Sequence, residues 1–280
     1  MIEIPSPSPL AAGLLRLLEP VGSSHAKLLE QLLDGTYKKP FIEDCGPLRY
    51  LHFDLDNVQS VMRVDDPDAL CLAYTRKMMA FLLFNSAPRR ILQLGLGGGS
   101  LAKFCYRHLP DALITVVEID TDVLSLRDEF RVPHDDQRFR VVKGDAVDYI
   151  AGHGRREDVI IVDACDRNGL SPALSAPDLY QNLRRRLTLN GVLVVNICGE
   201  EDDVESHLAR ITGVFGQRLI ALPAKEDGNL IVFGFRAEPM ALEGAALDTY
   251  ARKLEDRFGL AFPRYVRQME YGVRGMSLFG

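Results

Sequence analysis

Between residues 88 and 236, short apolar runs alternate with amphipathic stretches along the chain. Strands are usually short and continuously apolar when they are covered on both faces, whereas helices repeat their apolar positions every three to four residues. The pattern predicts strands at 90–94, 113–117, 139–143, 159–162 and 192–196, and helices at 99–108, 121–129, 145–151, 175–188 and 202–214, with Asn190-Gly191 closing the fourth helix. Such alternation is typical of a parallel sheet with helical crossovers.

The sheet is expected to end differently. Residues 218–222 and 229–235 read as two strands, and the link between them is a short turn containing Lys225-Glu226-Asp227-Gly228. Because so short a link cannot hold a crossover helix, the two strands must pair antiparallel. The sequence therefore predicts an α/β fold with a class I AdoMet-methyltransferase-like Rossmann sheet, in which parallel strands end in an antiparallel hairpin.

The flanking segments carry other patterns. Residues 1–87 are expected to form helices at 10–18 and 25–33, a β-hairpin at 48–64 and a helix at 67–84. Residues 237–280 are expected to contain a helix at 242–258 and an irregular end. We thus expect an N-terminal region of helices and a β-hairpin (1–87), a nucleoside-binding catalytic domain (88–236) and a C-terminal helical extension (237–280).

Composition narrows the class of protein. A chain of 280 residues with 47% hydrophobic content can bury a substantial core, and its net charge of -6 argues against general affinity for nucleic acid. The five cysteines are scattered singly and the six histidines lack metal-ligand spacing, so we expect reduced thiols and no metal. No apolar run has the length of a membrane span and the start lacks a basic leader, which predicts a cytoplasmic protein without a membrane partner.

The first predicted strand runs into Gly95-Leu96-Gly97-Gly98-Gly99-Ser100, which opens a helix. Glycines at such a turn let a ligand approach the backbone, because no Cβ stands in the way. We interpret Gly95, Gly97, Gly98 and Gly99 as cofactor-binding. The alternative is a tight turn that binds nothing.

Acidic residues follow the next two strands. Glu118 closes the second strand about 20 residues beyond the glycines, where a carboxylate accepts hydrogen bonds from ribose hydroxyls in dinucleotide folds. The alternative to a ribose-binding role is that Glu118 merely lies at a solvated strand end. Asp145, followed by Ala146, either accepts a hydrogen bond from an adenine amino group or caps the next helix, and the two roles are compatible. Together these residues indicate a nucleoside with free ribose hydroxyls.

Two further acids, Asp163 and Asp166, follow the fourth strand and face the crevice where ligands bind in open α/β sheets. Paired carboxylates there can hold a cationic amine, orient its lone pair and take up its proton. The alternative is that Asp163 braces the glycine loop and Asp166 caps a turn. Cys165, which lies between them, is expected to be a packing residue.

Over residues 48–236 the chain resembles the spermidine synthase, or polyamine aminopropyltransferase, family. The matching pieces are the glycine loop, Val117-Glu118-Ile119-Asp120, Gly144-Asp145-Ala146, Asp163-Ala164-Cys165-Asp166, the segment 174–180 and the hairpin Asn57-Val58-Gln59-Ser60. The resemblance implies that Gln59, Glu118 and Asp145 contact the nucleoside. It also implies that Asp163 binds and deprotonates the attacking amine, with Asp166 beside it and Tyr74 at the position of a family tyrosine.

Two positions depart from the family. In the family's glycine loop an aspartate, which holds the amino group of the aminopropyl arm, stands where this chain has Gly98. A loop of bare backbone amides at a helix N-terminus suits a carboxylate, which AdoMet has and its decarboxylated form lacks. In addition, the family's Tyr-His-Glu cluster is replaced here by Tyr74-Thr75-Arg76.

Three functions follow from these observations. The first is a spermidine synthase-like transferase that moves an aminopropyl group to an amine such as putrescine. The second is an AdoMet-dependent methyltransferase acting on a small molecule, and the third is a catalytically inactive nucleoside-binding protein. The expected cofactor is S-adenosylmethionine or decarboxylated S-adenosylmethionine, and no metal is expected. The expected partner is a small-molecule amine rather than nucleic acid. The sequence leaves open whether the protein forms a homodimer.

Overall fold

The computed structural model describes residues 1–7, 13–152, 154–166, 169–170, 176, 178–199, 201–238 and 244–271, with the backbone alone at 165–166, 169–170, 201 and 270–271. Its larger sheet has the order β15-β13-β14-β12-β9-β6-β7-β8. The strands are β6 Arg90–Leu94, β7 Leu113–Glu118, β8 Phe139–Lys143, β9 Glu157–Val162, β12 Leu187–Ile197, β13 Leu219–Ala224, β14 Asn229–Phe235 and β15 Glu270–Tyr271.

Strand pairing confirms the expected fold. Strand β6 pairs parallel with β7 and β9, β7 pairs parallel with β8, and β12 pairs parallel with β9. Strand β14 lies between β12 and β13 and pairs antiparallel with both. The sheet is therefore parallel along one half and closes with the antiparallel hairpin that the short turn at 225–228 predicted.

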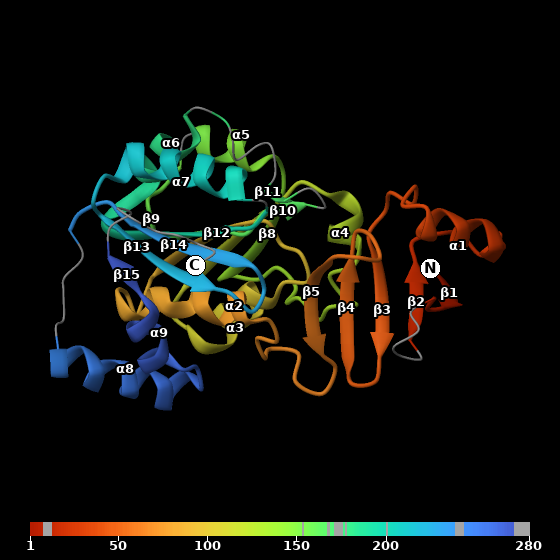
Figure 1. Ribbon diagram of the computed structural model, residues 1–280, viewed down its shortest axis with the longest axis horizontal. Helices are drawn as coiled ribbons and strands as arrows, with labels where there is room; N and C mark the ends of the chain where they lie inside the picture. Colours follow the sequence, from red (N-terminus) through yellow and green to blue (C-terminus); the bar gives the residue numbers. More distant parts are fainter. Residues whose placement is uncertain are drawn as a thin grey trace.

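Helices cover the sheet on both faces (Figure 1). One face carries α5 Ala146–Ala151, α6 Leu179–Arg186 and α7 Glu201–Phe215, and the other carries α2 Ala73–Met78, the 3-10 helix η1 Met79–Leu83, α3 Ser100–His108, α8 Gly244–Phe258 and α9 Phe262–Gln268. A short helix, α4 Thr121–Ser125, follows β7. No helix in the described part of the chain is long and apolar enough to cross a membrane.

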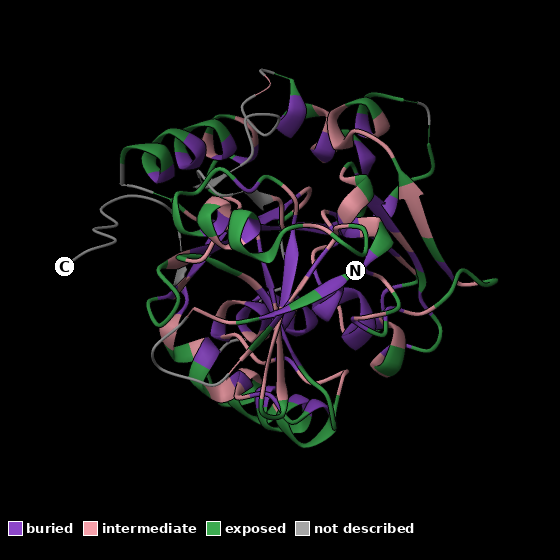
Figure 2. Ribbon diagram, turned by 90° about the vertical axis from the view of Figure 1, so that its right-hand side faces the viewer, coloured by how far each residue is buried: buried purple, intermediate pink, exposed green. Residues whose placement is uncertain are grey.

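Alternation along the strands builds one core on each face. Ile91 and Ile161 pack in the cluster that contains Phe81 of η1, whereas their neighbours Leu92 and Ile160 belong to the cluster on the opposite face. Figure 2 shows the consequence, since the strands at the centre are buried and the outer surfaces of the helices are exposed. Strands buried on both faces explain why these segments read as continuous apolar runs.

The N-terminal residues form a second, antiparallel sheet of five strands in the order β1-β2-β3-β4-β5, beside the larger sheet (Figure 1). Its elements are β1 Ile2–Pro5, β2 Leu14–Leu17, β3 Phe41–Cys45, β4 Leu48–His52 and β5 Val58–Arg63, with helix α1 His25–Leu33 between β2 and β3. The predicted hairpin is confirmed as β4 and β5. The first residues of β5, next to the hairpin tip, include Gln59, which lines the cavity, and Ser60, which packs against Gly98 of the glycine loop.

An ion-pair cluster ties this sheet to the larger domain. The carboxylate of Glu129, beyond α4, accepts hydrogen bonds from Arg16 of β2 at 2.5 and 2.9 Å and from Arg49 of β4 at 2.9 Å. Arg49 also donates to the backbone carbonyl of Glu129 at 2.8 Å. These three side chains are 17–25% exposed, so the contacts are shielded from bulk water.

The structure corrects four predictions of secondary structure. The helix expected at 10–18 is wrong where it is described, because Leu14–Leu17 is strand β2 and alternates exposed and buried positions. The helix expected from Pro67 begins only at Ala73. Asn190-Gly191 does not close a helix, since β12 already starts at Leu187 and is irregular between Leu187 and Val192. The end expected to be irregular contains α9 and β15.

Candidate active site

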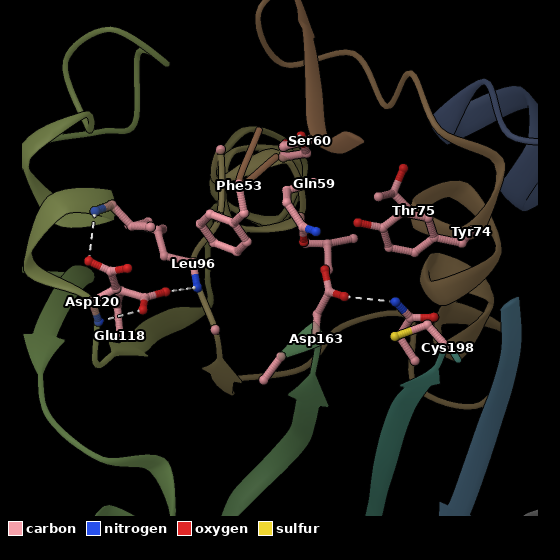
Figure 3. A pocket seen from close by; sticks show the side chains of 18 of the residues that line it. Phe53, Gln59, Ser60, Tyr74, Thr75, Leu96, Glu118, Asp120, Asp163 and Cys198 are labelled. Atoms are coloured by element: carbon pink, nitrogen blue, oxygen red, sulfur yellow. Dashed lines mark hydrogen bonds between the residues drawn. The ribbon is translucent and has the colours of Figure 1, made fainter. Parts of the chain in front are cut away.

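A cavity of about 980 Å³ opens at the carboxyl ends of the parallel strands and is closed by the tip of the β4–β5 hairpin (Figure 3). Its walls include most of the predicted site residues, namely Gln59, Tyr74, Gly95, Gly97, Gly98, Glu118, Asp145, Ala146 and Asp163. Gly99 does not contribute to the wall. The side chain of Asp166 lies outside the described residues, as do residues 167–168 and 171–175. The structure thus brings predicted residues from six separate segments to one volume.

The glycine loop packs directly on the end of β9. Gly95 has a φ of +91°, and a Cβ at this position would lie 2.1 Å from the backbone carbonyl oxygen of Asp163. Only glycine fits such a close approach in the left-handed region. The loop and the proposed base are therefore held next to each other by the backbone.

Glu118 is buried, with 8% of its surface exposed, and its carboxylate is engaged by the protein itself. One oxygen accepts a hydrogen bond from the amide of Leu96 at 2.8 Å, and the other accepts from the amide of Asp120 at 2.8 Å. Hydrogen bonds from two backbone amides thus fix the position of this buried carboxylate. Glu118 therefore braces the glycine loop at the cavity wall, and it does not lie at a solvated strand end.

Asp145 caps helix α5. Its Oδ1 accepts hydrogen bonds from the amides of Val147 at 2.6 Å and Asp148 at 3.2 Å, as expected of an N-cap residue. Asp145 and Ala146 also line the cavity. Because both capping bonds use Oδ1, Oδ2 stays available to a ligand, and the two predicted roles are compatible in this geometry.

Asp163 lies at the other side of the cavity from Glu118, between the ends of β9 and β12 (Figure 3). Its Oδ1 accepts a hydrogen bond from Nδ2 of Asn196 at 2.9 Å, and the hydroxyl of Tyr74 also donates to the carboxylate. Burial raises the pKa of Asp163 to about 6, while the bonds from Asn196 and Tyr74 oppose that rise. A carboxylate with such a pKa is ionised at neutral pH and is basic enough to accept a proton.

Tyr74 connects Asp163 to the β13–β14 turn. Its backbone amide donates to Oδ2 of Asp227 at 2.6 Å. Burial, followed by the neighbouring charges of Asp163 and Asp227, holds the pKa of the Tyr74 hydroxyl well above its usual value. The phenol is therefore protonated and acts as a hydrogen-bond donor to Asp163.

Gly98 lies against the tip of the hairpin. A Cβ at this position would come within 2.6 Å of Oγ and 2.9 Å of Cβ of Ser60, and within 3.0 Å of a ring carbon of Phe130. The hydroxyl of Ser60 shares a hydrogen bond with that of Ser100 at 3.2 Å, and both serines are at most 9% exposed. Neutral hydroxyl groups thus occupy the region where the family's aspartate would project.

The charge of the cavity is strongly biased. Among its described lining residues there is one cationic side chain, Lys38, and there are six carboxylates. The carboxylates are those of Asp56, Glu118, Asp120, Asp145, Asp163 and Asp227. A concave surface lined by one sign of charge attracts the opposite sign. The cavity suits cationic ligands, a class that includes both sulfonium compounds and amines. In the described residues, no group of three or more His, Cys, Asp or Glu side chains is placed to hold a metal ion.

Sequence reasoning missed Ser60, Asn196, Asp227 and Asn229 as site residues, although all four line the cavity. Asn196 stands near the end of the fifth parallel strand, so the rule that ligands bind at the carboxyl ends of strands would have found it. The other three reach the cavity from a hairpin tip and from the β13–β14 turn. Nothing in a single sequence signals those approaches.

The cysteine prediction needs one correction. Cys198, which lines the cavity near Asp163, is disulfide-bonded, so the expectation that all thiols are reduced is wrong at this position. Cys45, Cys71 and Cys105 are free, as expected. The side chain of Cys165 lies outside the described residues, and its packing role stays a prediction.

Comparison with known proteins identifies the family. A family model described as the spermine/spermidine synthase domain matches residues 71–217. A polyamine aminopropyltransferase of Chromobacterium violaceum is 38% identical over 230 residues, which cover 82% of this chain and 88% of that protein. Both findings match the expected family.

Two solved structures are similar in fold. A probable spermidine synthase from Corynebacterium glutamicum superposes with a TM-score of 0.65 at 22% identity, covering 83% of this chain and 87% of that chain. Human methyltransferase-like protein 13 in complex with SAH superposes with a TM-score of 0.57 at 26% identity, covering 75% of this chain and 98% of that chain. The same fold therefore occurs in proteins named for two different transfers.

Proposed function

Because the chain belongs to the spermine/spermidine synthase family and is a transferase, we propose that it moves an aminopropyl group from decarboxylated AdoMet to an amine such as putrescine. The observation that carries this proposal is the position of Asp163 at the cavity wall, held by Tyr74 and Asn196. Its free lone pairs are the natural acceptor for an N–H of the incoming amine.

In the proposed reaction the amine nitrogen attacks a carbon bound to the sulfonium sulfur of the donor. A C–N bond forms, the C–S bond breaks, and the sulfur leaves as a neutral thioether. The nitrogen then carries an extra proton, which passes to the carboxylate of Asp163. Tyr74 and Asn196 keep the carboxylate oriented, and the acidic cavity favours two cationic reactants.

The nucleoside half of the donor is proposed to lie on the opposite wall. Glu118 and Asp120 face this side (Figure 3), and Asp145 and Ala146 also line the cavity. The ribose hydroxyls would bond to Glu118 and the adenine amino group to Oδ2 of Asp145, while Gln59 covers the nucleoside from the hairpin. Oδ2 of Asp145 takes no part in the capping bonds, and each oxygen of Glu118, which accepts one amide hydrogen, has a second lone pair for a ribose hydroxyl.

Purified protein tests the proposal directly. It should convert putrescine and decarboxylated AdoMet to spermidine and methylthioadenosine, and Asp163→Asn should reduce the rate by at least a hundredfold. Asp111→Asn is a matched control, because Asp111 is an exposed carboxylate whose nearest cation is 3.7 Å away at the surface. Absence of product from wild-type protein with several amines would contradict aminopropyl transfer.

A second candidate is methyl transfer from AdoMet to a small molecule, and two observations favour it. Ser60 fills the space beside Gly98 with neutral hydroxyl groups, and human methyltransferase-like protein 13 shares the fold at 26% identity. AdoMet carries a carboxylate that the backbone amides at the start of α3 suit. Calorimetry with AdoMet, decarboxylated AdoMet and methylthioadenosine separates the two candidates by the donor that binds. If none of the three compounds binds, both transferase functions are excluded, and so is the inactive nucleoside-binding protein.

A further inference from the structure

Asp163, Asn196 and Asn229 form a continuous chain of hydrogen bonds at the acceptor side of the cavity. Nδ2 of Asn229, at the start of β14, donates to Oδ1 of Asn196 at 2.7 Å. Nδ2 of Asn196, on β12, donates to Oδ1 of Asp163 at 2.9 Å. Asn196 is 2% exposed, and all three residues line the cavity.

The donor-to-acceptor direction of these hydrogen bonds affects the protonation of Asp163. A side-chain amide has a donor end and an acceptor end, and it can turn over to exchange them. In the observed orientation Asn196 offers its NH₂ group to Asp163, which stabilises the ionised carboxylate. In the reversed orientation the amide oxygen would face the carboxylate, which favours the protonated acid instead. The partner of Asn196 on its far side therefore influences which form of Asp163 is preferred.

We propose that Asn229 is a positioning residue, which acts through Asn196 to keep Asp163 ionised and its Oδ1 fixed, so that the carboxylate can take the proton of the acceptor amine. The inference rests on the proposed function for the identity of that proton. The hydrogen-bond relay itself does not depend on which group the enzyme transfers.

Other groups near Asp163 are accounted for. Tyr74 from α2 donates to Asp163 and stays protonated, and Asp227 from the β13–β14 turn is bonded to the backbone of Tyr74. Cys198 after β12 is disulfide-bonded and does not titrate. Gln93 of β6 is neutral and donates to the carbonyl of Gly95 at 2.7 Å. Among these groups, Asn196 is the side-chain amide that bonds directly to Asp163 and can exchange its donor and acceptor ends.

Asn229→Asp makes that exchange with almost no change in size. An aspartate at 229 is an acceptor only, which favours the orientation in which Asn196 turns its NH₂ group toward residue 229 and its oxygen toward Asp163. The midpoint of the Asp163 titration should rise by about one pH unit. Asn229→Leu removes the donor without adding a charge and should move the midpoint in the same direction by a smaller amount.

The titration is measured by ¹³C NMR of labelled aspartate carboxyls in the free protein, with Asp163→Asn to assign the signal. Asn190→Asp is the matched control, because Asn190 is exposed on the same strand, β12, and should leave the midpoint unchanged. In the same variants the acid limb of kcat/KM should shift with the NMR midpoint, so that Asn229→Asp loses about tenfold below it and little at pH 9. The acceptor amine titrates equally in all variants, so differences between variants report Asp163.

Two results would overturn the relay: an unchanged midpoint in Asn229→Asp, or a shift in Asn229→Asp that Asn229→Leu lacks. Either excludes control through Asn196, and an unchanged midpoint with a loss of activity at every pH indicates a purely structural role. Because the NMR titration needs neither donor nor acceptor, a shifted midpoint in a protein without transferase activity would support the relay while contradicting the proposed function.

Discussion

The side chain of Ser60 fills the space into which a side chain at position 98 would project, since a Cβ on Gly98 would lie 2.6 Å from Oγ of Ser60 and 2.9 Å from its Cβ. Ser60 belongs to the β4–β5 hairpin and Gly98 to the glycine loop. Helices α2 and η1 and strand β6 lie between these two residues in the sequence. Any acidic side chain introduced at position 98 therefore has to displace Ser60. This contact changes how donor selection can be engineered.

Gly98→Asp alone should weaken binding of both donors, because a Cβ at position 98 would overlap the side chain of Ser60, whereas the ring of Phe130 would have to move by only a few tenths of an ångström. The double variant Ser60→Gly with Gly98→Asp should recover binding and prefer decarboxylated AdoMet. Both donors carry an ammonium group that the aspartate can hold, but only AdoMet also carries a carboxylate, which the aspartate repels. We expect the ratio of the two dissociation constants, measured by calorimetry, to change by about tenfold to a hundredfold relative to wild type.

Ser60→Gly by itself is the control for loss of the Ser60–Ser100 hydrogen bond and should leave the donor ratio within about threefold of wild type. If Gly98→Asp alone reversed the preference as fully as the double variant, Ser60 would have no part in donor selection.

Asp163 should make stability depend on pH. Its pKa is about 6 in the folded protein and near 3.9 in the unfolded chain, so folding disfavours the ionised form. Below pH 4 the group is protonated in both states and has no effect. As pH rises toward 6 the unfolded chain ionises first, stability falls by about 2 to 3 kcal/mol, and above pH 6 the loss is constant.

Asp163→Asn removes this loss and should raise the melting temperature at pH 8 while abolishing transfer. Thermal unfolding of both proteins at pH 4.5, 6 and 8 checks the expectation, with Asp111→Asn as an exposed control. The difference between Asp163→Asn and wild type should widen from pH 4.5 to pH 6. A difference that stays the same across this range would show that Asp163 does not titrate near pH 6.

The parallel half of the fold could be predicted because its strands are buried on both faces and therefore read as apolar runs. The helix prediction at Leu14–Leu17 was wrong for a physical reason. This four-residue strand is stabilised by pairing with β1 and with β3, which is more than 20 residues away, so its local pattern of leucines gave no reliable signal.

The candidate site likewise has residues that the sequence could predict and contacts that it could not. Glu118 and Asp163 were found because strand ends meet at one edge of a parallel sheet. The bond from Glu118 to the amide of Leu96 and the contact between Ser60 and Gly98 depend on how loops fold over that edge. Sequence patterns place residues on elements, whereas these contacts arise only when the elements have packed.

Glu118→Gln should weaken both stability and nucleoside binding. A glutamine has one acceptor oxygen, so one of the amides of Leu96 and Asp120 loses its partner in a buried site. We expect about 1 to 3 kcal/mol of lost stability in urea unfolding and at least a tenfold weaker dissociation constant for methylthioadenosine. Glu205→Gln, on the exposed side of α7, is the control and should change neither quantity. Unchanged affinity with reduced stability would limit Glu118 to bracing the loop.

Glu129→Gln tests whether the N-terminal sheet controls access to the cavity. The substitution removes the charge that Arg16 and Arg49 share, and these partly buried bonds should contribute about 1 to 3 kcal/mol to stability. Strand β4 carries Arg49 and leads to the tip with Gln59 and Ser60. Looser docking of this hairpin should therefore weaken nucleoside binding in calorimetry, although Glu129 is not part of the cavity wall.

Asp65→Asn is the matched control, because Asp65 pairs with Arg63 at the surface of the same hairpin and is 61% exposed. Surface pairs contribute little, so this variant should keep both stability and affinity. A loss of stability in Glu129→Gln without any loss of affinity would mean that the hairpin tip is held by its contacts with the glycine loop alone. A parallel loss of both would show that the ion-pair cluster, distant from the ligand, keeps Gln59 and Ser60 in place over the nucleoside.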